Sequence, residues 1–159
     1  DIEGYVVSSG IESLMKGTSL SKSFTDIFGG SLYEKNGVIA GIKSSITFTE
    51  KTKFVFAINK GITSNIREEP YNVNNFVEES QRRVPFENMI YLGDGPSDIP
   101  CFSMIEKHGG SCIAINSKDV WTKKWEFELR SRKMNPLKPD YTKGSELRKK
   151  LESLISEII

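Results

Sequence analysis

Long apolar runs, excess charge of one sign and clusters of metal-binding side chains are all missing from this sequence of 159 residues. No stretch approaches the roughly 20 apolar residues of a membrane-spanning helix, and no leader of basic and then apolar residues opens the chain, so we expect no membrane contact. The 22 basic and 21 acidic residues leave a net charge of +1, which is too little to hold nucleic acid by neutralising phosphates. Cys101 and Cys112 have no metal-ligand spacing, and free thiols are typical of the cytoplasm.

Apolar strands alternate with helices along the chain. The pattern predicts strands at 5–10, 88–95 and 111–116, a hairpin at 28–42 around Asn36-Gly37, and helices at 11–24 (broken near Gly17), 50–61, 96–110 and 144–159. Residues 62–84 predict a loop with a helix across 73–82, and residues 120–141 a helix and a short strand. This order indicates one α/β domain over 1–159, a three-layer Rossmann-like fold whose mostly parallel sheet has helices on both faces.

Two of the predicted strands end in polar, flexible turns, Ser8-Ser9-Gly10 and Gly93-Asp94-Gly95. Ligands of parallel α/β sheets bind at the carboxyl ends of the strands, so we expect both turns to face one crevice. Asp94 and Asp98 offer the hard oxygen ligands that suit Mg²⁺, while Gly93 and Gly95 let the backbone approach closely.

The other turn has the chemistry of a phosphate site. The hydroxyl of Ser8 and the amides of Ser9 and Gly10, at an expected helix start, predict a small anion site. Lys51, at the start of the helix 51–60, brings a compact positive charge. Metal, hydroxyl, amides and lysine together are typical of a site that handles a phosphoryl group, where catalysis depends on positioning and charge stabilisation.

The order of "YVVSSG", a lysine before a helix, and "YLGDGPSD" resembles the haloacid dehalogenase (HAD) superfamily of Mg²⁺-dependent phosphatases. The hairpin "LYEKNGVIAG" and the segment "GDGPSDIPCFSMIEKHGG", with its paired glycines after the expected helix, are similar to its phosphoserine-phosphatase-like branch. The resemblance implies a small phosphorylated substrate, with Ser8 binding phosphate, Lys51 steadying nucleophile and phosphate, and Asp94 and Asp98 holding Mg²⁺. Lys53 competes with Lys51 for the lysine role.

The aspartate nucleophile of that family, followed two positions later by a second acid, has no counterpart in the sequence. Asp1-Ile2-Glu3 is the nearest imitation, but no apolar strand leads into it. We therefore expect the carboxy-terminal part of a longer protein, a HAD-like core without its first strand and inactive alone. The neighbouring strands would then lack a partner, which predicts a homo-oligomer or a swapped strand in that place.

Alternative interpretations stay open. A noncatalytic HAD-like module could bind phosphate, metal or a partner protein, and the chain could equally be a processed product or a naturally truncated protein. An unrelated nucleotide-binding α/β domain is less favoured because the sequence has no Gly-x-Gly-x-x-Gly or Walker loop. We interpret His108 as a helix cap, and Trp121 and Trp125 as packing residues.

Overall fold

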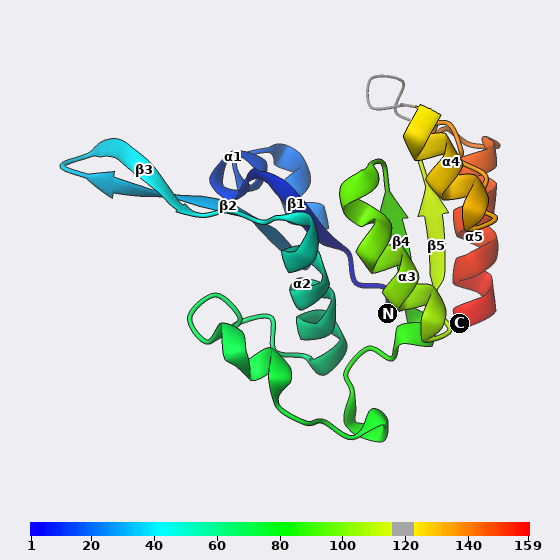
Figure 1. Cartoon of the computed structure of the whole chain (residues 1–159), viewed down its shortest axis with the longest axis horizontal. Coiled ribbons are helices and arrows are strands. Elements are labelled where there is room, and N and C mark those ends of the chain that lie inside the picture. The colour runs from blue at the N-terminus through cyan, green and yellow to red at the C-terminus, as the bar shows by residue number, and fades with distance from the viewer. Residues whose placement is uncertain (116–122) are drawn as a thin grey trace. The chain divides into compact units, whose positions relative to one another are not determined.

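The computed structural model describes residues 1–115 and 123–159, which divide into two compact units, Asp1–Arg83 (unit 1) and Val84–Ile159 (unit 2) (Figure 1). The predicted packing role of Trp121 lies outside the described residues. Among the described residues, every helix is too short or too polar to span a lipid bilayer.

Unit 1 is built on a mixed three-stranded sheet in the order β1-β2-β3. β1 runs parallel to β2, which turns back into the antiparallel β3. The bounds of its elements are β1 Tyr5–Ile11, α1 Glu12–Lys16, β2 Asp26–Lys35, β3 Val38–Ser44 and α2 Phe48–Lys60, with 3₁₀ turns at Ser19–Ser23, Pro70–Asn74 and Glu79–Gln81.

Turn chemistry fixes the element ends that the sequence predicts in unit 1. Asn36 and Gly37 both have positive φ angles, 56° and 75°, which suit the right-handed twist of a two-residue hairpin. α1 ends at Gly17, and α2 ends at Gly61, whose φ of 73° is left-handed. The predicted hairpin and both helix ends are confirmed.

The predicted helix across residues 73–82 is wrong, because this segment forms two short 3₁₀ turns. The ammonium group of Lys60 donates hydrogen bonds to the carbonyl oxygens of Val73 and Asn75, both at 2.6 Å. Those carbonyls would otherwise accept hydrogen bonds from amides four residues further along a helix. The segment also lacks a periodic apolar face whose burial could offset the unfavourable free energy of helix nucleation.

Unit 2 centres on a parallel pair of strands. Its elements are β4 Ile90–Gly93, α3 Ile99–Lys107, β5 Ser111–Ala114, α4 Lys123–Ser131 and α5 Glu146–Ile158, with 3₁₀ turns at Phe86–Asn88 and Pro96–Asp98. Ser145 caps α5 by accepting the amide of Arg148 at 3.3 Å, and His108 contacts the carbonyl oxygen of Met104 at 2.8 Å. Both predicted caps are confirmed.

Alternating residues of β5 pack into different cores. Ala114 lies with Phe102 of α3 and Trp125 of α4, while Ile113 lies with Leu147 and Leu154 of α5. Because successive side chains of a strand point to opposite faces, this strand pair carries α3 and α4 on one face and α5 on the other (Figure 1).

The predicted α/β class is confirmed, with a three-stranded mixed sheet and a two-stranded parallel sheet among the described residues. A single Rossmann-like sheet is not shown and stays a prediction, as does the single domain over 1–159.

Candidate functional site

The turn that follows β4 carries the two predicted metal ligands. β4 ends at Gly93, Asp94 is exposed, and a 3₁₀ turn at Pro96–Asp98 leads directly into α3. Asp98 is only 3% exposed, so its carboxylate needs hydrogen-bond partners to remain buried.

Three donors converge on the buried carboxylate of Asp98. The hydroxyl of Tyr91 donates to Oδ1 at 2.8 Å, and the amides of Asp94 and Gly95 donate to Oδ2 at 3.1 and 3.2 Å. The carboxylate thereby closes the turn onto the start of α3. The side chain of Asp98 thus accepts the backbone amides of this turn and also contributes negative charge to it.

Gly93 is the residue that permits this close packing. A Cβ atom there would lie 2.5 Å from Cβ of Asp98 and 2.7 Å from Cζ of Phe102, closer than carbon atoms pack. The ring of Tyr91 meets Phe102 edge-on, with centroids 5.7 Å apart. Burial, together with the charge of Asp98, raises the pKa of Tyr91 far above its usual value, so its hydroxyl stays a donor.

The fit to Mg²⁺ rests on the two carboxylates of this turn. Mg²⁺ is usually held by one or two carboxylates together with water and substrate phosphate, which Asp94 and Asp98 can match. Within residues 1–115 and 123–159, no group of three or more His, Cys, Asp or Glu side chains could hold a metal ion. Asp94 has the exposed carboxylate, whereas Asp98 already accepts three hydrogen bonds.

The predicted phosphate turn is a bulge inside β1 and not the tip of the strand. Val7 pairs with Phe28 and Ile11 with Gly30, so Ser8, Ser9 and Gly10 lie opposite a single residue of β2. The hydroxyl oxygen of Ser8 accepts the amide of Gly10 at 3.0 Å. The following helix α1 begins at Glu12, so the expected position of Ser9 and Gly10 at a helix start is wrong, because β1 continues to Ile11.

The two candidate lysines occupy different environments on α2. Lys51 lies near the helix N-terminus and is 7% exposed. Lys53 forms an ion pair with Glu50 at 3.0 Å, and its ammonium lies 4.9 Å from the ring centroid of Phe54. Lys53 is thus bound by its neighbours on the helix, and which of the two lysines fills the lysine role stays a prediction.

The structure assigns the predicted site residues to different units. The serine turn and Lys51 belong to unit 1, while Gly93, Asp94, Gly95 and Asp98 belong to unit 2. The aspartates and glycines of unit 2 come together in one turn. The single crevice shared by both turns stays a prediction.

Glu3, the acidic residue of the Asp1-Ile2-Glu3 segment, is bound within unit 1. The hydroxyl of Tyr5 donates to it at 2.7 Å, and the guanidinium of Arg83 forms a short ion pair with its other oxygen. The hydroxyl of Tyr5 and the positive charge of Arg83 hold the pKa of Glu3 below its usual value. Glu3 is therefore explained by its neighbours in unit 1.

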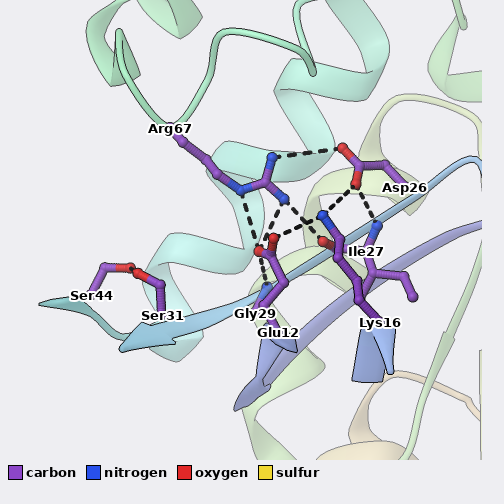
Figure 2. A network of polar contacts seen from close by, with 8 residues as sticks. All are labelled: Glu12, Lys16, Asp26, Ile27, Gly29, Ser31, Ser44 and Arg67. Atoms are coloured by element: carbon purple, nitrogen blue, oxygen red, sulfur yellow. Dashed lines mark hydrogen bonds and ion pairs between the residues drawn. The ribbon is translucent and has the colours of Figure 1, made fainter. Parts of the chain in front are cut away.

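Sequence reasoning missed a polar network that holds α1 against β2 (Figure 2). Arg67 donates to Glu12 from Nε at 3.2 Å and from Nη2 at 2.9 Å, and Lys16 pairs with the other oxygen of Glu12 at 2.8 Å. Asp26 lies 3.3 Å from Lys16 and 3.7 Å from Arg67. The charges of two acidic and two basic side chains cancel in this network, which is typical of ion pairs that stabilise a fold. No sequence signal joins Arg67 to Glu12, which lie 55 positions apart.

Comparisons with known proteins give one distant relative. A protein of Borreliella burgdorferi, described as uncharacterized, is 29% identical over 165 residues, which cover 92% of this chain and 55% of that protein. The chain therefore spans about half the length of the curated relative it matches. No family model and no solved structure matches the sequence.

Proposed function

We propose that the chain is part of a HAD-type, Mg²⁺-dependent phosphomonoesterase that acts on a small phosphorylated substrate in the cytoplasm. The observation that carries the proposal is the turn after β4, where an exposed Asp94 and a buried Asp98 follow an apolar parallel strand. The proposal includes a single Rossmann-like sheet, completed by a strand that this sequence does not contain.

Unit 2 would hold Mg²⁺ through Asp94 and Asp98. When bound, the ion would neutralise charge on the phosphate oxygens of the substrate. Asp94 supplies the exposed carboxylate, while Asp98 keeps the turn in shape through the amides of Asp94 and Gly95.

Unit 1 would bind the phosphoryl group. Because the oxygen of Ser8 accepts from Gly10, its own hydroxyl proton remains to be donated to a phosphate oxygen. Lys51 lies near the N-terminus of α2 and would supply a compact positive charge to that anion.

The complete reaction needs a carboxylate nucleophile from outside this sequence. That carboxylate would attack phosphorus, the alkoxide would leave as the P–O bond breaks and take a proton from water, and a second water would hydrolyse the aspartyl-phosphate to carboxylate and phosphate. Because the sequence has no Asp-x-Asp segment, we expect the 159-residue chain to be inactive by itself. Among the described strands, β1 pairs with β2, and β4 pairs with β5. A second copy or a swapped strand could pair with the outer edge of β1 or of β4.

A noncatalytic role as a module that binds phosphate, metal or a partner protein is the second candidate. The absence of an Asp-x-Asp segment from the sequence favours it.

A phosphatase assay with a generic aryl phosphate and Mg²⁺ separates the two. The chain is compared with a version extended by its upstream coding sequence. Each is tested unchanged, with Asp94→Asn, and with the control Asp140→Asn, which changes an exposed aspartate of unit 2. An inert short chain and an active long one that only Asp94→Asn disables support the phosphatase. Silence in both favours the noncatalytic module, and activity of the short chain would place a nucleophile within it.

A further inference from the structure

The hydroxyl of Tyr91 is directed at the metal-binding turn from the interior of unit 2. Its ring packs edge-on against the fully buried Phe102, and its oxygen donates to Oδ1 of Asp98 at 2.8 Å. The strand β4 and the helix α3 thus fix this hydroxyl from two sides. A tyrosine held in this way can restrain the carboxylate that it contacts.

The restraint on Asp98 continues into the turn. A carboxylate is a rigid plane, so a donor that fixes Oδ1 also fixes Oδ2, which accepts the amides of Asp94 and Gly95. Those two amides flank the α-carbon of Asp94. The orientation of the exposed Asp94 carboxylate therefore depends on hydrogen bonds that begin at Tyr91.

We infer that Tyr91 is a positioning residue for the metal, acting through Asp98 to aim the Asp94 carboxylate. The inference rests on the proposed function, since it assumes that Asp94 holds Mg²⁺. It also assigns Asp98 mainly to holding the turn, because three donors already occupy its carboxylate. Residues that contact a metal ligand often change metal affinity 10- to 100-fold when they are removed, and Tyr91 acts one contact further out, so we expect an effect at the lower end of that range.

Tyr91→Phe tests the inference because it keeps the ring against Phe102 and deletes only the hydroxyl. The matched control is Tyr5→Phe, which deletes a tyrosine hydroxyl donating to the carboxylate of Glu3 at 2.7 Å in unit 1. Mg²⁺ is titrated into the 159-residue chain, and the amide resonances of Asp94 and Gly95 are followed by NMR. We expect the Kd for Mg²⁺ to rise about tenfold in Tyr91→Phe and to stay unchanged in Tyr5→Phe.

The outcomes separate this inference from the proposed function. Unchanged Mg²⁺ affinity in Tyr91→Phe, with affinity lost in Asp94→Asn, overturns the positioning role and leaves the metal site standing. A wild-type chain whose Asp94 and Gly95 amides do not respond to Mg²⁺ overturns both. If Tyr91→Phe does not fold, 3-fluorotyrosine at position 91 replaces it, because the fluorine changes the strength of the hydrogen bond to Asp98 and keeps the hydroxyl; an unchanged Kd for Mg²⁺ then overturns the inference.

Discussion

Replacing Gly93 by alanine tests the close packing on which the candidate metal turn depends. The added Cβ would lie 2.5 Å from Cβ and 2.7 Å from Cγ of Asp98, and 2.7 Å from Cζ of Phe102. Asp98 and Phe102 are both buried, so neither can swing into solvent to make room. Gly93 has no positive φ angle, so the whole effect of the substitution comes from the collision.

The size of the effect follows from what must move. Overpacking of a buried site usually costs about 1–3 kcal/mol. Displacing Asp98 would also weaken the hydrogen bonds from Tyr91, Asp94 and Gly95, each contributing about 1 kcal/mol. We therefore expect Gly93→Ala to lower the free energy of unfolding of unit 2 by about 3 kcal/mol.

Urea unfolding followed by tryptophan fluorescence gives the measurement, since residues 1–83 contain no tryptophan and Trp125 is 1% exposed in unit 2. Gly144→Ala is the matched control in the same unit, because its Cβ would meet no atom within 4 Å while its φ of +89° costs about 1 kcal/mol. A loss in Gly93→Ala no larger than the loss in Gly144→Ala would refute the close approach of Asp98 and Phe102 to Gly93.

Three further predictions concern local features of the two units. Lys133 has a left-handed φ of 57° just after α4, so Lys133→Gly should raise the free energy of unfolding by about 1 kcal/mol, measured by the same urea titration. Arg67→Met should destabilise unit 1, measured as faster amide exchange in α1 and β2, because it takes a cation from the partly buried Glu12 and Asp26 and leaves them the charge of Lys16 and one backbone amide each. Burial and the hydrogen bond to Glu3 raise the pKa of Tyr5 to about 12, so stability from this hydroxyl is present below about pH 10 and is lost as the pH rises through about 12. Absorbance at 295 nm should show a tyrosinate step near pH 12 that Tyr5→Phe removes.

Elements whose signals are local could be predicted from the sequence. The apolar positions Leu147 and Leu154 and the cap Ser145 define α5, and all three act as expected. Asn36-Gly37 likewise suffices to place the hairpin, because its backbone conformation is a property of those two residues. In each case the information lies within a few residues of the feature it determines.

Features that depend on distant partners could not be predicted in this way. The sequence does not reveal that Lys60 donates to the carbonyl oxygens of Val73 and Asn75, which ties this segment to the end of α2. The bulge in β1 depends on its register with β2, which only the paired strands determine. Tyr91 looks like any aromatic residue of a buried strand until its hydroxyl is seen to meet Asp98.

Several residues proposed to bind phosphate or Mg²⁺ are buried charges or interrupt regular strand pairing. Lys51 is a cation in a buried place near a helix N-terminus, and Ser8 and Gly10 interrupt the pairing of β1 with β2. Asp98 is a buried acid that packs against Gly93, and a Cβ atom at position 93 would collide with it. A bulge leaves part of a strand outside the ladder, whereas the burial of Asp98 is offset by the three hydrogen bonds that it accepts. The β1 bulge and Lys51 lie in unit 1 and Asp98 in unit 2, so each unit has its own departure from regular structure.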